Sequence, residues 1–233
     1  MEALPYTVHR ISLLNVSVYL IYREGQAILV DSGNSGSEQL ILDALKEQGL
    51  EPSMLKLVIL THAHFDHAGS AAKLKELTPC QVMIHHIDSE RLEKGYAPLP
   101  PGTRWKAKIL VGLGRIFARR MGKFPPVRPD ILVQDTFDLK KYGFPGMVYH
   151  TPGHTPGSMV VLMEGGELIG GDTLFGVENK QHFPPFAEDL PALVSSWKMI
   201  RELPVKTMYP AHGKYFSFES FLSEFDGAMD RYE

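Results

Sequence analysis

The chain has 233 residues, of which 44% are hydrophobic and 22% are charged, and these values are ordinary for a globular protein. The formal net charge of −3 argues against nucleic acid or an anionic membrane as the main partner. Cys80 is the only cysteine, which excludes a disulfide within the chain and favours a reducing, cytoplasmic location.

The N-terminal residues lack the basic start and long apolar run of a signal peptide, and we expect no such peptide and no membrane insertion. Three strands joined by tight turns are predicted over residues 6–14, 16–22 and 26–30. The third strand leads into Asp31-Ser32-Gly33, a turn signal. We expect the Asp31 carboxylate to order this turn by accepting backbone hydrogen bonds rather than to bind a ligand.

A helix over 37–48, a buried strand over 56–60 and a helix over 68–77 are predicted next. The turn between the last two elements carries four potential metal ligands, spaced H-x-H-x-D-H: His62, His64, Asp66 and His67. A strand-to-helix turn allows such side chains to converge on one point. Neutral imidazole and carboxylate together suit zinc and similar ions, so this turn predicts a metal site.

A strand over 81–85 ends in His85 and His86, which we interpret as structural because no carboxylate accompanies them at close spacing. Residues 88–130 differ in composition and are interpreted as a helical, basic insertion. Its helix, predicted over 104–121, is flanked by prolines. Three roles stay open: a helix packed on the domain with a solvated basic face, a lid over the metal site that favours anionic substrates, or a membrane-surface or dimer element.

Further strands are predicted over 131–133, 136–139, 147–150, 159–163, 167–169 and 207–209, and further helices over 190–203 and 217–231. Three more candidate ligands lie in glycine-rich turns beside these strands. They are His154 in Thr-Pro-Gly-His-Thr, Asp172 in Gly-Asp-Thr, and His212 in Pro-Ala-His-Gly. Each would be a weak signal alone, because single turn residues of these types are common.

Taken together, these motifs resemble those of the metallo-β-lactamase superfamily, in the right order and spacing over nearly the whole chain. The resemblance implies one α+β domain over 1–233, a four-layer αβ/βα sandwich with the metal site at one edge. It also implies that His62, His64 and His154 hold one metal ion, that Asp66, His67 and His212 hold a second, and that Asp172 bridges the two. We expect two Zn²⁺ per chain, although Fe or Mn suits the same ligands.

Two divalent ions about 3.5–4 Å apart can hold a hydroxide between them, and zinc lowers the pKa of bound water to about 7. Asp66 is predicted to orient the water and to pass a proton to the leaving group. Candidates to hold the imidazoles through their other nitrogen are Asp31, Thr61, Thr151, Thr155 and Ser158. Phe175 and His182 are predicted to contact substrate, with a solvated loop histidine as the alternative for His182.

The expected activity is hydrolysis of an ester, lactone or thioester bond of a small molecule. Glyoxalase II-like enzymes share Gly171-Asp172-Thr173 but carry a C-terminal glutathione-binding domain, for which this chain has no room. Lactonase-like enzymes place a tyrosine where Phe175 stands, and class B β-lactamases lack the bridging aspartate. The alternatives are a mononuclear iron persulfide dioxygenase-like oxidoreductase and a non-catalytic binding protein on the same fold. The sequence leaves a homodimer open.

Overall fold

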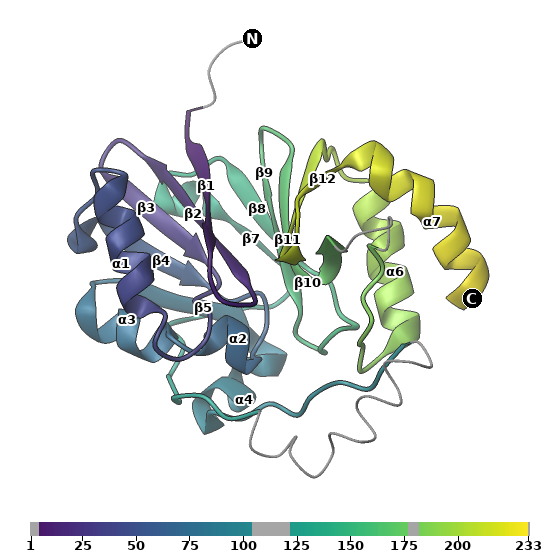
Figure 1. Ribbon diagram of the computed structural model, residues 1–233, viewed down its shortest axis with the longest axis horizontal. Coiled ribbons are helices and arrows are strands. Elements are labelled where there is room, and N and C mark those ends of the chain that lie inside the picture. Colours follow the sequence, from purple (N-terminus) through teal and green to yellow (C-terminus); the bar gives the residue numbers. More distant parts are fainter. Residues whose placement is uncertain (1–4, 104–121, 177–181, 233) are drawn as a thin grey trace.

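The computed structural model describes residues 5–103, 122–176 and 182–232. Two six-stranded sheets lie face to face, and helices cover the outer face of each sheet (Figure 1). Within the described ranges no helix is long and apolar enough to cross a membrane.

The first sheet is formed by the N-terminal half in the order β1-β2-β3-β4-β5-β6. Its strands are β1 (Thr7–Ser12), β2 (Ser17–Arg23), β3 (Gln26–Val30), β4 (Leu55–Ile59), β5 (Gln81–His85) and β6 (Ile131–Val133). Pairing is antiparallel from β1 to β3 and parallel from β3 to β6. The parallel strands require crossovers, and these are the helices α1 (Glu38–Glu47), α3 (Ala71–Leu77) and α4 (Ser89–Lys94).

The second sheet is formed by the C-terminal half in the order β12-β11-β10-β9-β8-β7. Its strands are β7 (Thr136–Asp138), β8 (Gly146–His150), β9 (Met159–Met163), β10 (Glu167–Gly176), β11 (Thr207–Gly213) and β12 (Phe216–Ser217). Only β10 and β11 pair in parallel, and the chain passes between them through α6 (Leu190–Arg201). The last helix, α7 (Phe218–Tyr232), covers the same outer face as α6 (Figure 1).

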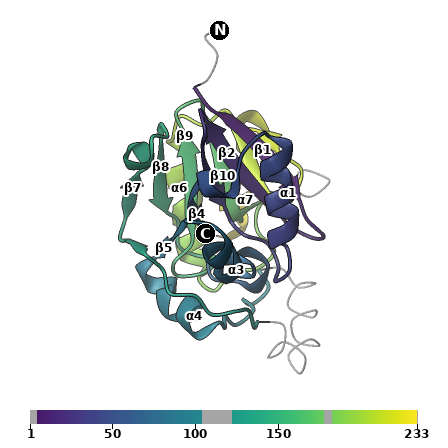
Figure 2. The ribbon, with the colours of Figure 1, turned by 90° about the vertical axis from the view of Figure 1, so that its left-hand side faces the viewer.

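Three apolar cores separate the four layers, and the alternation of side chains along each strand explains them. In β3, Leu29 packs under the helices of the first sheet, whereas Ile28 and Val30 face the second sheet. In β9, Val161 faces the first sheet and Val160 packs under α6 and α7. Strands buried on both faces are apolar throughout, which is why these runs show little polar alternation. The predicted four-layer sandwich is confirmed (Figure 1), and Figure 2 looks onto the first sheet with α1 and α3 in front of it.

The predicted helix over 68–77 is wrong at its start. The structure has two helices, α2 (Phe65–Ala68) and α3, and between them the backbone N–H of Gly69 donates to the carbonyl of Gly33, on a neighbouring segment. A Cβ atom on Gly69 would lie 2.3 Å from the backbone nitrogen of Ser35. The short helix α4 and strand β12 were not predicted, and β10 continues well past residue 169. The helix predicted over 104–121 lies outside the described residues.

Candidate metal centre

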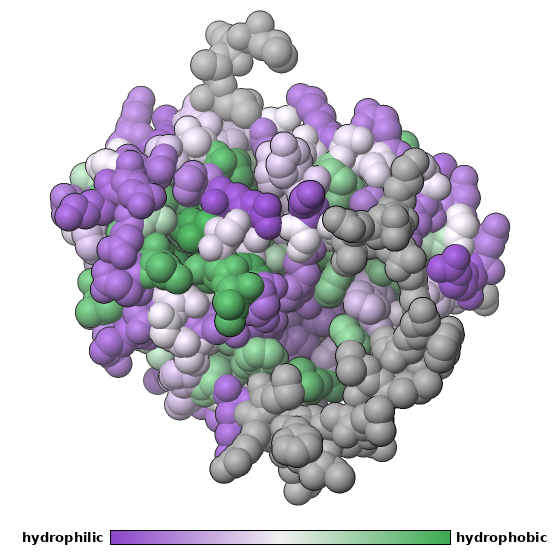
Figure 3. Space-filling view, viewed as in Figure 1, coloured by the Kyte–Doolittle hydropathy of each residue, from purple (hydrophilic) through white to green (hydrophobic). Residues whose placement is uncertain are grey.

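The structure brings together all seven residues that the sequence predicts as metal ligands. They come from both sheets: His62 and His64 follow β4, Asp66 and His67 lie in α2, His154 follows β8, Asp172 lies in β10 and His212 lies in β11. Strand ends of both sheets meet at this edge, where the surface is hollowed between the two halves of the molecule and hydrophilic side chains gather (Figure 3).

The cluster has two halves, and a further group of close ligand atoms, from His62, His67 and Asp172, spans both. The three-histidine half consists of His62, His64 and His154, and the mixed half consists of Asp66, His67 and His212. Within each group the potential ligand atoms lie within 4.8 Å of one another. In the three-histidine half, Nδ1 of His64 lies 2.8 Å from Nε2 of His62 and 3.1 Å from Nε2 of His154. Three nitrogen atoms therefore converge on one point.

The carboxylate of Asp172 lies between the two halves. Its Oδ2 is 3.4 Å from Nε2 of His154, in the three-histidine half. Its Oδ1 is 3.3 Å from Nε2 of His67 and 3.3 Å from Nε2 of His212, in the mixed half. One carboxylate thus presents one oxygen atom to each half.

Each ring of the three-histidine half is oriented by a contact of its other nitrogen. Nδ1 of His62 lies 3.1 Å from the Thr61 hydroxyl, and Nε2 of His64 lies 3.2 Å from the carbonyl oxygen of Pro98. Nδ1 of His154 lies 3.0 Å from the carbonyl oxygen of Phe186. Since these acceptors take the ring N–H, the nitrogen that faces the cluster keeps its lone pair, as a metal ligand requires.

The rings of the mixed half are oriented in the same way but by different groups. Nδ1 of His67 donates to Oδ2 of Asp31 over 2.8 Å, and Nδ1 of His212 lies 2.8 Å from the carbonyl oxygen of Asn15. Asp31 also accepts from the backbone nitrogen and the hydroxyl of Thr61. Its φ of +63° is unusual for a residue other than glycine and is one that aspartate tolerates. Asp31 accepts a backbone hydrogen bond as predicted, but from Thr61 in the turn after β4 rather than from its own turn, and it in addition orients His67.

The protonation states of the two halves differ. Burial, reinforced by the neighbouring His154, lowers the pKa of His64 to about 3. Burial also lowers the pKa of His62, with help from His67 and His64, and it lowers the pKa of His154. The three-histidine half is therefore neutral around pH 7, ready to donate lone pairs.

Nearby carboxylates have the opposite effect in the mixed half. Burial alone would lower the pKa of His212, but Asp172 and the contact with Asp66 outweigh it and raise that pKa to about 9. For His67, Asp31, Asp172 and Asp66 outweigh burial and hold its pKa well above the usual value. Burial likewise opposes ionisation of Asp172, yet His212, His67 and His154 hold the pKa of this carboxyl below its ordinary value.

Two buried polar atoms at the centre of the cluster lack hydrogen-bond partners among the described residues: Nε2 of His67 and Oδ1 of Asp172. A buried polar atom without a partner costs about 1–3 kcal/mol, and native proteins rarely leave one unexplained. Both atoms point toward the other candidate ligands. Five imidazoles and two carboxylates, each oriented and aimed inward, fit divalent metal ions of the zinc type.

Helix α6 holds two of the three ligand-bearing segments of the second sheet, those of His154 and Asp172. The indole Nε1 of Trp197 donates to the carbonyl of Thr173, next to Asp172, over 2.8 Å. The hydroxyl of Ser196 donates to the carbonyl of Pro152, two residues before His154, over 2.7 Å. Both side chains are buried. Two consecutive residues of one helix thereby fix the positions of two strand ends.

The path of β10 places Asp172 at the centre. Its register against β11 shifts on both sides of Gly171, a bulge that redirects the strand. Gly171 has a φ of +49°, and a Cβ atom there would lie 2.5 Å from the hydroxyl oxygen of Thr61. Only glycine satisfies both the backbone angle and the close approach to the turn that carries the histidines.

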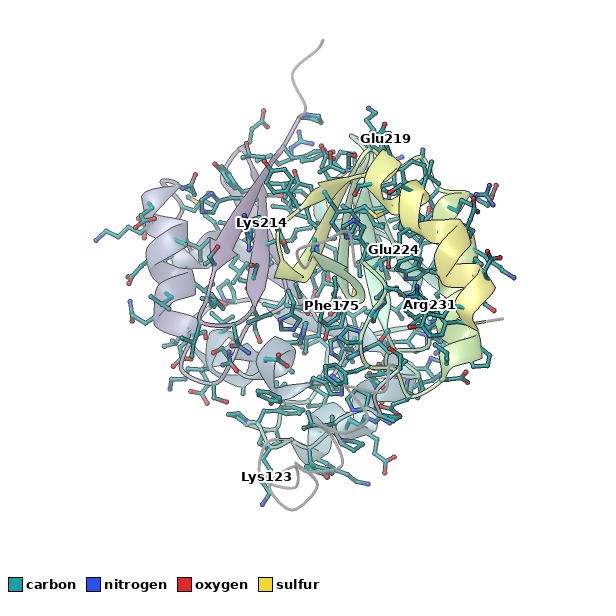
Figure 4. The ribbon with its side chains drawn as sticks, turned by 45° about the vertical axis from the view of Figure 1, so that its right-hand side comes forward. Lys123, Phe175, Lys214, Glu219, Glu224 and Arg231 are labelled. Carbon is teal, nitrogen blue, oxygen red and sulfur yellow. The ribbon has the colours of Figure 1, made fainter. Side chains whose placement is uncertain are left out.

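The two residues predicted to contact substrate occupy different environments. Phe175 lies beside the cluster, between the two halves of the molecule (Figure 4), with its ring stacked on His212 at a centroid distance of 5.3 Å. His182 is outside the cluster and stacks on Phe216. Its Nδ1 contacts the carbonyl of Phe175 and its Nε2 contacts the hydroxyl of Ser220 in α7. The alternative of a solvated loop histidine is wrong, because only 4% of His182 is exposed.

Sequence reasoning identified some of the orienting groups and missed others. Asp31 and Thr61 contact ligand rings as expected, whereas the hydroxyls of Thr151 and Thr155 contact other side chains. The carbonyls of Asn15, Pro98 and Phe186 could not have been found, since every residue carries one. The structural interpretation of His85 holds: it is buried and stacks on His150.

Comparison with known proteins agrees with this geometry. A sequence profile described as the metallo-beta-lactamase superfamily matches residues 11–212, which include the whole cluster. The chain belongs to the metallo-β-lactamase superfamily. The solved structure of BJP-1, a subclass B3 metallo-β-lactamase of Bradyrhizobium japonicum, is similar with a TM-score of 0.71 over 98% of this chain and 90% of that one. At 19% identity this likeness shows the shared fold alone.

Two curated relatives of this superfamily member are named as hydrolases. A probable metallo-hydrolase of Methanocaldococcus jannaschii is 27% identical over 191 residues, which cover 80% of this chain and 82% of the relative. A hydroxyacylglutathione hydrolase of Methylobacillus flagellatus is 28% identical over 197 residues, which cover 84% of this chain and 61% of that enzyme. These names support hydrolase activity at the level of the superfamily.

Proposed function

We propose that the protein is a hydrolase that holds two divalent metal ions, zinc in the simplest case, and cleaves an ester, lactone or thioester bond of a small molecule. The observation that carries this proposal is the position of Asp172, whose two carboxylate oxygens face the two halves of the cluster at 3.3–3.4 Å. A carboxylate shared in this way suits a two-metal site, in which the ions lie about 3.5–4 Å apart.

His62, His64 and His154 would hold one ion, Asp66, His67 and His212 the other, and Asp172 would contribute to both. When bound, such ions supply a nucleophile from water near neutral pH and stabilise negative charge on the substrate oxygen. The chain's own task is to hold the rings rigidly, and the contacts from Thr61, Pro98, Phe186, Asp31 and Asn15 do so.

Asp66 is the carboxylate best placed to handle protons. Burial opposes its ionisation, but His67 and the hydrogen bond to His212 outweigh burial and hold the pKa of Asp66 below its ordinary value. Its Oδ2 lies 3.5 Å from Nε2 of His212, and 9% of the residue is exposed. An ionised carboxylate at the edge of the cluster can orient the attacking water, accept its proton and pass that proton to the leaving group.

Thioesters are the first substrates to test. The relative named hydroxyacylglutathione hydrolase supports this choice, since that name specifies an acyl group linked to a thiol. Phe175 closes one side of the cluster with an apolar ring rather than a hydrogen-bond donor. Because the Phe175 ring cannot donate a proton, the site suits a substrate whose leaving group needs little protonation, such as a thiolate.

The test begins with metal content, measured by mass spectrometry on protein purified without added metal. We expect close to two zinc ions per chain in the natural protein and in the control Asp226→Asn, an exposed carboxylate of α7. The same preparations would then be assayed against a panel of thioesters, esters and lactones.

Three results would overturn the proposal. One iron per chain with oxygen consumption would favour the mononuclear iron oxidoreductase instead. Binding of two zinc ions without hydrolysis of any panel member would contradict the proposed reaction. A protein that binds no metal would contradict the proposed metal site itself.

A further inference from the structure

Asp88 is a buried aspartate for which the proposed reaction has no role. It ends the 3₁₀ turn η2 (His86–Asp88) at the start of α4, and none of its surface is exposed. An aspartate at the start of a helix ordinarily accepts a hydrogen bond from a backbone N–H of the first turn. The Asp88 side chain makes no such bond, so capping of α4 does not explain a buried carboxylate at this position.

The carboxylate instead contacts both segments that carry the three-histidine half. Its Oδ2 accepts a hydrogen bond from the Thr155 hydroxyl over 2.7 Å and lies 3.4 Å from the backbone nitrogen of Ala63. Ala63 stands between two histidines of that half, and Thr155 directly follows the third. A single oxygen atom thus links the turn after β4 to the loop after β8.

A short chain of hydroxyl groups ends at the same oxygen. The hydroxyls of Thr155 and Ser158 are 2.9 Å apart. Because the single hydroxyl proton of Thr155 goes to Asp88, the Ser158 hydroxyl must donate to Thr155. The loop after β8 also packs closely against the Asp88 carboxylate, since a Cβ atom on Gly157 would lie 2.7 Å from Cγ of Asp88.

The other oxygen of Asp88 makes no hydrogen bond to the described residues, and its nearest cation, Nη1 of Arg91, is 3.8 Å away. Arg91 pairs instead with Glu188 through two hydrogen bonds of 2.5 and 2.8 Å. The backbone nitrogen of Glu188 donates to the carbonyl of Gly153, on the far side of the same loop. A buried carboxylate so weakly paired costs folding free energy, so its contribution to stability alone does not account for it.

We propose that Asp88 is a positioning residue for the three-histidine half, holding the 62–64 turn and the 153–155 loop at the separation at which three imidazoles can share one metal ion. The inference rests on the proposed metal-binding function. Asp31 orients His67 of the mixed half directly and His62 through Thr61, whereas Asp88 contacts only the segments that carry the three-histidine half.

The test uses Co²⁺ as the probe, because its visible absorption reports coordination geometry. Asp88→Leu removes both acceptor oxygens with little change of shape, and Thr155→Val removes only the hydroxyl. Asp88→Asn retains one acceptor oxygen and serves as the conservative rescue. Thr78→Val is the matched control: this buried threonine donates to the carbonyl of Leu74 in α3.

We expect Asp88→Leu and Thr155→Val to lower the affinity of one ion by about 10–100-fold while the second ion changes less than threefold. The Co²⁺ absorption bands that Asp88→Leu and Thr155→Val lose should be the bands that His64→Ala also lacks and that His212→Ala retains. Asp88→Asn should recover most of the affinity, and Thr78→Val should match the natural protein. The thermal midpoint of metal-free Asp88→Leu should not fall.

The inference alone fails if the natural protein binds two ions and both variants bind them equally well. It also fails if both ions weaken together in proportion to a lower thermal midpoint, which would indicate a purely structural role. A natural protein that binds no Co²⁺ would overturn the proposed function, and this inference with it.

Discussion

The three-histidine half contains only imidazoles, whereas the mixed half contains a carboxylate and lies beside Asp31 and Asp172. In the first, burial and the neighbouring imidazoles outweigh the effect of the nearby carboxylates, and the rings are neutral around pH 7. In the second, the carboxylates outweigh burial and the rings of His67 and His212 hold protons at neutral pH. The comparison teaches that the same residue type within one cluster is set to opposite protonation states by its neighbours.

The largest effect should come from the residue that the two halves share. Asp172→Asn replaces one carboxylate oxygen by an amide NH2 group, which does not bind a metal, and removes the negative charge. Both ions should therefore weaken and hydrolysis should fall by about 10³-fold or more, equivalent to about 4 kcal/mol. Metal content and turnover of the variant would be compared with Asp226→Asn. Loss of only one ion would show that Asp172 belongs to one half.

The two halves should differ in the number of protons that they release when a metal ion binds. At pH 7 an ion entering the mixed half must displace about two protons, from His67 and His212, whereas an ion entering the three-histidine half should displace almost none. Affinity of the mixed half should therefore rise by up to about 100-fold per pH unit until pH reaches about 9, the pKa of His212.

Calorimetry in buffers of different ionisation enthalpy measures this release. His64→Ala isolates the mixed half and His212→Ala isolates the three-histidine half. Equal proton release by the two variants would contradict the difference in protonation.

Asp31→Asn should weaken the mixed half more than the three-histidine half, because Asp31 contacts His67 directly and His62 only through Thr61. Asparagine tolerates the φ of +63° at this position, so the backbone should persist while the charge that supports His67 is lost. We expect a loss of about 10–100-fold in the affinity of one ion, measured by competition with a chelator. Asp138→Asn, an exposed aspartate that accepts from the backbone nitrogen of Lys140, is the control. Equal weakening of both ions would contradict the direct support of His67 by Asp31.

The metal-free protein should be most stable near pH 6.5. A histidine with a raised pKa, such as His212, stabilises the fold below 6.5 and loses that contribution as pH rises toward about 9. A histidine with a lowered pKa, such as His64, stabilises the fold above pH 6.5 and loses that contribution as pH falls toward about 3. Urea unfolding with chelator between pH 4 and 9 measures the curve. His212→Ala should reduce the loss of unfolding free energy between pH 6.5 and 9. An unchanged loss in this range would contradict the raised pKa of His212.

The smallest effect should come from a single hydrogen bond on α6. Ser196→Ala removes the donor to the carbonyl of Pro152 and should cost about 1 kcal/mol of unfolding free energy, with a small loss of affinity in the three-histidine half. Ser195→Ala is matched, since the exposed hydroxyl of Ser195 donates to the carbonyl of Pro191 in the same helix. Identical unfolding curves for the two variants would exclude an anchoring role for Ser196.

Much of the fold followed from local sequence patterns. Apolar runs flanked by turn residues gave the strands 81–85, 131–133 and 159–163 with the bounds that the structure has. The extension of β10 beyond residue 169 was missed because Gly170 and Gly171 end the apolar run, while the backbone continues in pairing with β11. Strand pairing depends on the neighbouring strand as well, so the sequence of one segment alone does not determine where its pairing ends.

Sequence alone determined which side chains form the site. A metal ligand must be a specific residue type, so histidines and aspartates at fixed spacings in turns leave a readable signature. Tertiary structure decided which atom of each ring faces the cluster and which rings carry protons. The orienting carbonyls of Asn15, Pro98 and Phe186 leave no signature, because every residue has a carbonyl group. Proton affinities depend on distances between groups far apart in the chain, and only the folded sandwich sets those distances.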